Sequence, residues 1–284
     1  MAQKRKNQEF SCMVKEATIS FTDTGKGYPN IVLLHGFLES KQVWKNWITS
    51  FPKSYRIITI DLPGHGQSDT IGYYHSMELL SDIVLGVLKH IGIRRYFLFG
   101  HSMGGYVSLA FNARHPEHLK GLGLIQSTPL ADSPERKKIR DKAIKLVKKD
   151  SNKYVEVTLT ALFSNSFKKN NPNLINQMLK LAQQMSPQSI AASLHGLKDR
   201  PSHVSTLQNS STPCLLLAGE SDKTVPLSDL LHVFETSPKT EIIIIPNGSH
   251  MAYLEQLDDC ITPCIQFIKN HSSGLLTQTS LVNT

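Results

Sequence analysis

The sequence predicts an α/β fold with a mostly parallel central sheet flanked by helices. Strand-like and helix-like segments alternate along most of the chain, and most apolar runs end at Gly, Pro or Asp residues. Between those runs lie amphipathic segments whose apolar residues have helical spacing. The 284 residues are enough for one such core with an insertion.

The predicted core elements lie in the first and last parts of the chain. Strands are expected where short apolar or alternating runs occur, at 17–23, 31–34, 56–60, 95–99, 121–125, 214–218 and 241–245. Helices are expected where apolar stripes occur, at 77–91, 103–114, 226–234 and 256–269. We therefore assign residues 1–127 and 202–284 to the α/β core.

The middle of the chain, residues 128–201, is predicted to be an all-helical lid insertion. Helix starts there show a capping residue followed by proline, at Ser133-Pro134, Asn171-Pro172 and Ser186-Pro187. Ile139, Ala143, Leu146 and Val147 give the first of these helices an apolar stripe. No run in this stretch has convincing strand character.

The net charge of +8 is concentrated in the predicted lid. Residues 129–200 hold fourteen Lys/Arg and six Asp/Glu, so the rest of the chain is nearly neutral. Such an excess can attract anionic substrates or an acidic partner, and a solvated helical face rich in lysine gives the same pattern. No aromatic residues are interleaved with the basic runs, so no binding of nucleic acid is expected.

The first residues and the cysteines indicate a cytoplasmic protein. The first ten residues are polar and basic with no apolar stretch after them, so no signal peptide is expected. No apolar run reaches the roughly 18 residues of a membrane span. The four cysteines lack Cys-x-x-Cys spacing and are expected to be reduced. We expect a monomer or a homodimer.

The candidate nucleophile is Ser102, in the run Gly100-His101-Ser102-Met103-Gly104. A Gly-x-Ser-x-Gly run between a strand and a helix forms a sharp turn that exposes the serine oxygen at the carboxyl edge of the sheet. Glycines flank the serine because a Cβ would clash in so crowded a turn. A predicted strand precedes this run and a predicted helix follows it, so Ser102 is predicted to be the nucleophile of a serine hydrolase.

Two more residues that follow predicted strands complete a catalytic triad. A serine hydroxyl needs a base, and His250 follows the last predicted strand, at the same edge of the sheet as Ser102. The base needs a carboxylate, for which Asp222 follows the preceding strand. Glu220 competes with Asp222, while Asp132 follows an earlier strand but resembles a helix cap. The chain order Ser, Asp, His is typical of this arrangement.

A tetrahedral intermediate also needs two backbone hydrogen-bond donors. We expect them to be the amide of Met103 and the amide of Phe37, which lies in the loop after the strand at 31–34. Phe37 and His101 are further expected to contact the substrate, and His35 to shape its loop by hydrogen bonds. No cluster of metal ligands is present in the sequence, so neither a metal nor an organic cofactor is expected.

With these residues in place, the chain resembles the α/β-hydrolase superfamily over about residues 17 to 270. The matching motifs are Leu34-His35-Gly36-Phe37, Asp61-Leu62-Pro63-Gly64-His65-Gly66-Gln67-Ser68-Asp69, the turn at Ser102, Gly219-x-x-Asp222-x-x-Val225-Pro226 and Gly248-x-His250. The resemblance implies an α/β-hydrolase fold with a helical lid between the sixth and seventh core strands.

Serine at the turn resembles small carboxylesterases, including methyl ester esterases that act on carrier-bound acyl chains. Haloalkane dehalogenases and epoxide hydrolases use aspartate there. The resemblance implies a serine hydrolase that cleaves carboxylic esters of small to medium acyl chains through an acyl-enzyme on Ser102.

Other members of the superfamily leave alternatives open. His35-Gly36-Phe37-Leu38-Glu39-Ser40 with Trp44 resembles the lyase of menaquinone synthesis, in which Gly usually stands at the place of Glu39. Carbon–carbon bond hydrolases and cofactor-free perhydrolases share the triad, and the basic lid would suit an anionic substrate. A non-catalytic protein of the same fold is a further hypothesis, which the presence of all three triad residues disfavours.

Overall fold

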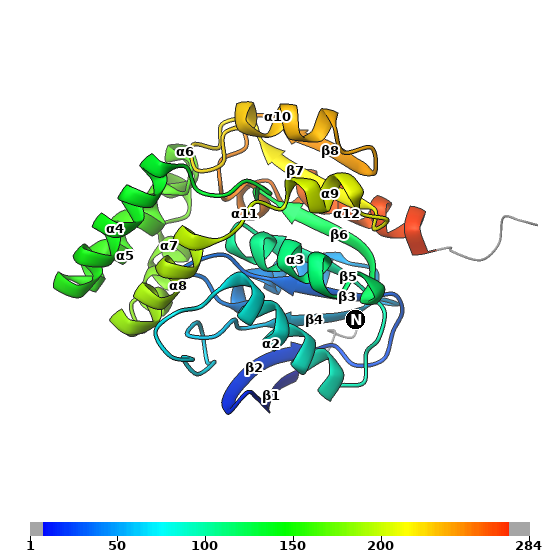
Figure 1. Cartoon of the computed structure of the whole chain (residues 1–284), viewed down its shortest axis with the longest axis horizontal. Helices are drawn as coiled ribbons and strands as arrows, with labels where there is room; N and C mark the ends of the chain where they lie inside the picture. The colour runs from blue at the N-terminus through cyan, green and yellow to red at the C-terminus, as the bar shows by residue number, and fades with distance from the viewer. Residues whose placement is uncertain (1–7, 273–284) are drawn as a thin grey trace, which may run out of the picture.

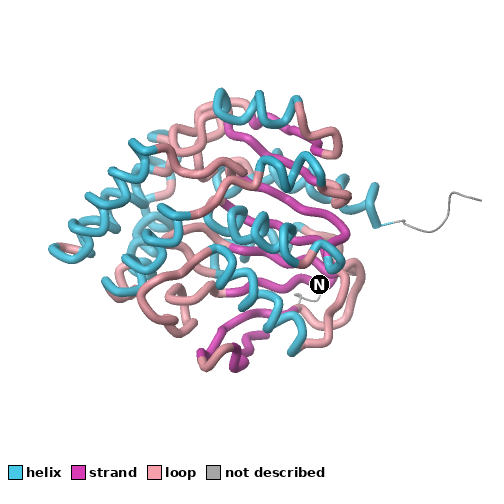
Figure 2. Tube along the Cα trace, viewed as in Figure 1, coloured by secondary structure: helices cyan, strands magenta, loops and turns pink. Residues whose placement is uncertain are grey.

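The computed structural model describes residues 8–272 and is built around one eight-stranded sheet (Figure 1; Figure 2). The order of the strands is β1-β2-β4-β3-β5-β6-β7-β8, with β1 and β2 antiparallel to their neighbours and β3 to β8 parallel. The strands are β1 Gln8–Val14, β2 Ala17–Asp23, β3 Asn30–Leu34, β4 Arg56–Ile60, β5 Tyr96–His101, β6 Leu119–Ile125, β7 Cys214–Gly219 and β8 Thr240–Ile245. The predicted mostly parallel sheet is therefore confirmed.

Helices cover both faces of this sheet (Figure 1). They are η1 Lys41–Trp44, α1 Lys45–Ser50, α2 Met77–His90, α3 Met103–Arg114, η2 Pro116–His118, α9 Val204–Asn209, α10 Leu227–Glu235, α11 Ala252–Glu255 and α12 Leu257–Ser272. These helices pack on both faces of the central strands, and all six residues of β5 are buried. Parallel strands buried in this way give continuous apolar runs, which is why the sequence predicted them clearly.

Strand β1 was not predicted from the sequence. It pairs with β2 at the edge of the sheet, and only Cys12 among its residues is buried, so no apolar run marks it. The turn between the two strands holds Lys15 and Glu16, both at positive φ (48° and 64°). Hairpin turns with positive φ usually contain Asn or Gly, so this turn carries no recognisable signal.

The helical segment, residues 134–199, lies between β6 and β7 and gathers at one end of the sheet (Figure 1). It consists of α4 Pro134–Lys149, α5 Ser151–Ala161, α6 Asn165–Asn170, α7 Pro172–Ala182 and α8 Pro187–Asp199. The predicted caps Ser133, Asn171 and Ser186 stand at the N-termini of α4, α7 and α8. Among the described residues, no helix is long and apolar enough to cross a membrane.

Asp132 is not a helix cap. Ser133 caps α4 instead, with its hydroxyl accepting a hydrogen bond from the Arg136 amide. The carboxylate of Asp132 is buried and accepts from Arg140 Nε at 3.1 Å and Arg200 Nη1 at 2.7 Å. A buried carboxylate requires such partners, so Asp132 joins the start of α4 to the end of α8.

Candidate active site

Ser102 occupies a strained turn between β5 and α3. The backbone of Ser102 has a φ of 48° and a ψ of −112°, a combination that residues with a side chain rarely adopt. Such a conformation costs about 1–3 kcal/mol. A Cβ on Gly100 would lie 2.2 Å from the Gly104 carbonyl carbon, and one on Gly104 would lie 2.4 Å from the Leu34 oxygen. The Ser127 hydroxyl donates to the Ser102 carbonyl at 2.8 Å. The flanking glycines and this contact hold the serine at the end of the strand.

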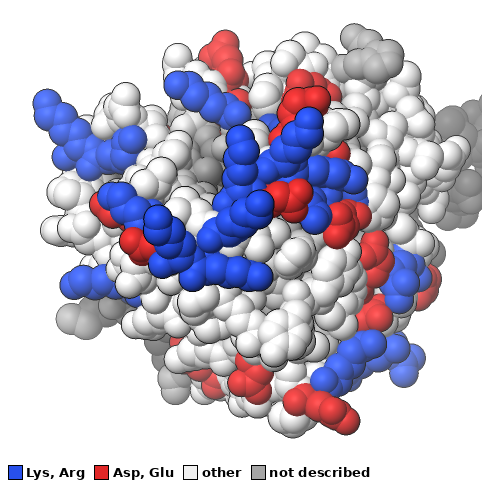
Figure 3. Space-filling model, turned by 60° about the vertical axis from the view of Figure 1, so that its left-hand side comes forward, with Lys and Arg blue, Asp and Glu red and all other residues white. Residues whose placement is uncertain are grey.

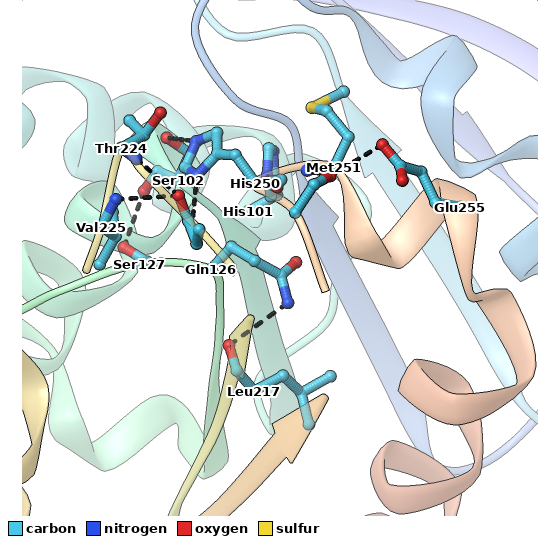
Figure 4. Close-up of polar contacts among 12 residues, drawn as sticks. His101, Ser102, Gln126, Ser127, Leu217, Thr224, Val225, His250, Met251 and Glu255 are labelled. Atoms are coloured by element: carbon cyan, nitrogen blue, oxygen red, sulfur yellow. Dashed lines mark hydrogen bonds and ion pairs between the residues drawn. The ribbon is translucent and has the colours of Figure 1, made fainter. Parts of the chain in front are cut away.

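The structure brings the three predicted triad residues together, and Figure 4 shows Ser102 and His250 side by side. His250 Nε2 lies 3.0 Å from Ser102 Oγ, and His250 Nδ1 lies 2.8 Å from Asp222 Oδ2. His250 follows β8 and Asp222 follows β7, so both reach the carboxyl edge of the sheet at which β5 ends. Both residues are buried, whereas Ser102 keeps partial exposure.

Asp222 is held as an anion that fixes the orientation of His250. Its Oδ1 accepts hydrogen bonds from the Thr224 and Val225 amides at 2.7 and 3.0 Å. Burial alone would raise the pKa of Asp222, but the charge and hydrogen bond of His250, with those two amides, lower it below its ordinary value. A carboxylate at Nδ1 places the imidazole proton there and leaves Nε2 free to accept from Ser102. Glu220, the competing carboxylate, is exposed and accepts instead from the Asn247 amide.

The two predicted oxyanion donors are backbone amides of residues that lie just after β3 and β5. Within residues 8–272, the backbone N–H groups of Phe37 and Met103 have no hydrogen-bond acceptor. His35 shapes the loop before Phe37, as the sequence predicts, because its Nδ1–H donates to the Gly36 carbonyl at 2.8 Å. Its Nε2 accepts from the Leu62 amide at 3.0 Å, and burial lowers the pKa of His35, so the ring stays neutral.

His101 does not lie where the sequence predicted a substrate contact. Its side chain has no exposed surface, and both ring nitrogens contact protein atoms. Nδ1 faces the carboxylate of Glu39, while Nε2 is 3.0 Å from the carbonyl oxygen of His250. The ring also packs on Tyr253, with ring centroids 4.3 Å apart. His101 is therefore part of the protein interior next to the triad.

Sequence reasoning missed the roles of Glu39 and Tyr253 beside the triad. In the lyase of menaquinone synthesis, a glycine usually stands at the position of Glu39. This difference was the one signal in the sequence that pointed to Glu39. Tyr253 stands in α11, after His250, and its hydroxyl donates to Glu39 Oε2 at 3.2 Å. Nothing in the sequence around Tyr253 indicates that its hydroxyl reaches a carboxylate so far away along the chain.

A cavity of about 380 Å³ separates the loop that follows Phe37 from the helical segment. Helix α7 contributes Leu174, Met178 and Leu181 to its wall, and the core contributes Leu38 and Leu254. Polar groups on the core side include Lys41 and Asp61, a buried pair whose charged atoms are 2.7 Å apart. Its volume lies in the range of sites for small organic ligands.

Comparisons with known proteins identify the family of this chain. The family model described as the alpha/beta hydrolase fold matches residues 29–257. The chain is 26% identical to a 2-hydroxy-6-oxononadienedioate/2-hydroxy-6-oxononatrienedioate hydrolase of Burkholderia vietnamiensis, over 89% of this chain and 92% of that protein. It is 27% identical to the dihydrolipoyllysine-residue acetyltransferase component of the acetoin cleaving system of Pseudomonas putida, over 87% of this chain but 65% of that protein.

A solved structure supports the same assignment. A thermophilic esterase from Thermogutta terrifontis superimposes with a TM-score of 0.85 and 26% identity, covering 94% of this chain and all of the other. The match to the family model spans most of the chain and includes β3 to β8, on which the three triad residues depend. The chain belongs to the α/β-hydrolase family and is a hydrolase.

Proposed function

We propose that this protein is a serine hydrolase that cleaves carboxylic esters of small to medium acyl chains. The observation that carries the proposal is the run of hydrogen bonds Asp222–His250–Ser102, at 2.8 and 3.0 Å. The amides of Phe37 and Met103, which have no hydrogen-bond partner among residues 8–272, add to it. These parts are a nucleophile, its base, the carboxylate that orients the base, and two donors for an oxyanion.

In the proposed reaction, Ser102 Oγ attacks the ester carbonyl carbon while His250 Nε2 takes the hydroxyl proton. The amides of Phe37 and Met103 bind the negative oxygen of the tetrahedral intermediate. His250 then gives its proton to the leaving alkoxide, and the C–O bond of the ester breaks to leave an acyl-enzyme. Water, deprotonated by His250, attacks the acyl carbon and releases the acid, and the proton returns to Ser102.

The acyl chain is proposed to enter the cavity beside α7. Leu38 lines that cavity and directly follows Phe37, whose amide would hold the ester carbonyl oxygen. Met178 and Leu181 give the opposite wall an apolar surface. In this view residues 128–201 act as a lid that selects the length of the acyl chain. The four cysteines are free and buried, which supports the cytoplasmic location expected from the sequence.

A panel of p-nitrophenyl esters from acetate to decanoate tests the proposal. We expect measurable kcat/KM with a maximum at an intermediate chain length, because the cavity limits the chain that fits. Folded protein that turns over no ester in the panel would contradict the proposal.

A second candidate is hydrolysis of a carbon–carbon bond in an anionic substrate. It is favoured by a smaller cavity of about 150 Å³, lined by Arg136, Arg200 and Val225. Arg136 and Arg200 are the two cations that line it, and guanidinium groups bind carboxylates. Turnover of a 2-hydroxy-6-oxo-dienoate in the absence of ester turnover would identify this activity instead.

A further inference from the structure

The carboxylate of Glu39 lies between three backbone segments of the proposed site. Its side chain is fully buried. Glu39 Oε2 accepts from the Gly36 amide at 2.6 Å and from the Tyr253 hydroxyl at 3.2 Å. On its other side, His101 Nδ1 lies 3.0 Å from Oε1 and 3.2 Å from Oε2. One carboxylate thus contacts the oxyanion loop, the nucleophile turn and the helix after His250.

The contacts of His101 determine how many protons its ring carries. Nε2 is 3.0 Å from the carbonyl oxygen of His250, and a carbonyl oxygen only accepts, so Nε2 must carry a hydrogen. Nδ1 faces the carboxylate of Glu39, so one proton lies between them. Either the pair is neutral, with the proton on Glu39, or it is an imidazolium beside a carboxylate.

The donors around Glu39 and its buried Oε1 favour placing that proton on His101. The Gly36 amide and the Tyr253 hydroxyl both donate to Glu39, and burial with the charge of Glu39 raises the pKa of Tyr253, so its hydroxyl stays protonated. Glu39 Oε1 is buried without a hydrogen bond in the described structure, which would be costly unless a cation lay beside it. With the proton on His101, burial would still raise the pKa of Glu39, but the charge and hydrogen bond of His101, with the Gly36 amide, lower it.

We propose that Glu39 and His101 form a buried ion pair that positions the catalytic groups relative to one another. Glu39 holds the Gly36 amide and so fixes the loop that presents the Phe37 amide. His101 is the chain neighbour of Ser102 and donates to the backbone carbonyl of His250. The pair therefore ties the oxyanion donor, the nucleophile and the base, and both residues act as positioning residues.

The inference rests on the proposed function for its kinetic consequence. A misplacement of about 1 Å among reacting groups costs about 100-fold in rate. Glu39→Gln keeps the shape of the side chain but leaves the His101 cation without a counter-charge. We expect kcat on the best ester to fall about 10- to 100-fold with KM little changed, because Glu39 lines the cavity but its side chain is buried and glutamine has nearly the same shape.

A double variant separates an ion pair from two independent structural roles. In Glu39→Gln/His101→Gln neither buried charge remains. The glutamine oxygen introduced at position 39 can accept from the Gly36 amide, and the glutamine amide introduced at position 101 can donate to the His250 carbonyl. We expect the double variant to be more active than Glu39→Gln alone, since the uncompensated cation is gone. A double variant whose loss equals the product of the two single losses would overturn the proposal.

A measurement that needs no substrate tests the ion pair separately from the proposed function. In protein labelled with ¹⁵N-histidine at neutral pH, the ring nitrogens of His101 should both give imidazolium resonances, assigned by their absence in His101→Gln. A neutral ring would overturn the inference, whatever the esters show.

The matched control is Asp23→Asn. Asp23 forms a partly buried pair with Arg56 at the amino end of β4, away from the site. Its loss should lower the melting temperature and leave kcat within about twofold of wild type. An equal fall of kcat in the control would assign the effect of Glu39→Gln to general loss of stability and overturn the positioning role.

Discussion

The central strands of the sheet and the helical segment differ in how completely their apolar residues are buried. Every residue of β5 is buried, and most of β3, β4, β6 and β7 is as well. In the helical segment, large apolar side chains remain exposed: Ile139, Leu146, Val157, Leu174 and Leu181. The core fixes the atoms of the proposed chemistry, whereas the helical segment leaves apolar surface beside a cavity. We infer that the core determines the reaction and the helical segment determines the substrate.

The two regions also differ in charge. Figure 3 shows Lys and Arg gathered on the side of the molecule that carries the helical segment. Some of these cations are paired, as in Arg140 with Asp132 and Lys198 with Asp141. Most basic residues of α4 are exposed, so either an anionic partner or a solvated lysine-rich face remains consistent with them. Exposed charges add little to stability, so their loss would not affect the fold.

The largest expected effect comes from the core. Ser102→Ala should lower kcat on the best ester about 10⁴- to 10⁶-fold, because the attacking oxygen is removed. Ser108→Ala, which removes a buried hydroxyl of α3 bonded to the Gly104 carbonyl, is the matched control and should stay within about tenfold of wild type. Steady-state kinetics on the best ester give kcat for both variants. Residual activity of Ser102→Ala close to that of the control would show that another group is the nucleophile.

The next effect concerns the carboxylate. Asp222→Asn should lower kcat about 10⁴-fold at neutral pH, because the amide no longer holds the required tautomer of His250. Glu220→Gln changes an exposed carboxylate two positions away and should have almost no effect on kcat. Similar losses in both variants would mean that the assignment of Asp222 is mistaken.

A change in the helical segment should alter selectivity while leaving the chemistry intact. Met178→Trp partly fills the cavity and should lower kcat/KM for decanoate about 10- to 100-fold relative to acetate. Val157→Trp places the same side chain on an exposed position of α5 outside the cavity lining and should leave the preference unchanged. The ester panel measures both. An unchanged preference for acyl-chain length in Met178→Trp would show that the acyl chain does not bind in this cavity.

A smaller effect is expected where the two regions are joined. Glu255 Oε1 accepts from the Ser164 amide, at the start of α6, at 2.8 Å and from the hydroxyl of Ser249, next to His250, at 2.7 Å. Glu255→Ala should speed hydrogen exchange in α6 about tenfold, since charge-assisted bonds of this kind contribute about 1.5–3 kcal/mol. Glu156→Ala, which breaks an exposed pair with Lys153, is the control. Equal exchange in wild type and Glu255→Ala would show that this contact does not hold the segment.

Stability should depend on pH through the buried carboxylates of the core. Glu39 and Asp222 both have a pKa below their ordinary values of 4.5 and 3.8, so the unfolded chain binds their protons more readily than the native state. Their contribution is complete above these values and is lost as the pH falls below them. The urea midpoint should therefore be lower at about pH 3 than at about pH 7. An equal midpoint at the two values would contradict the ionised state of both groups.

The meeting of the three proposed triad residues could be predicted from the sequence because parallel strands end at one edge of a sheet. Ser102, Asp222 and His250 each follow a strongly apolar strand, so a short-range pattern was enough to bring them together. The contacts of Glu39 and Tyr253 could not be predicted, since they depend on how a loop, a turn and a short helix pack in three dimensions.

The exposure of the helical segment was also beyond prediction. Ile139 and Leu146 of the predicted apolar stripe of α4 are exposed to 61% and 43%, whereas Val147 of the same stripe is buried together with Ile144. Which face of a helix meets the core is decided by its neighbours, because helical spacing alone marks only an amphipathic segment. The positions of the proposed triad residues could be predicted from the order of the strands. The exposed surface of the helical segment could be known only from the full structure.

The central claim is that Ser102 is the covalent nucleophile, and active-site labelling tests it most directly. Wild-type protein incubated with a fluorophosphonate should gain one adduct, which peptide mass spectrometry should place on Ser102. Asp222→Asn should label far more slowly, since the base is no longer oriented. Folded wild-type protein without an adduct, or with the adduct on another serine, would contradict the account.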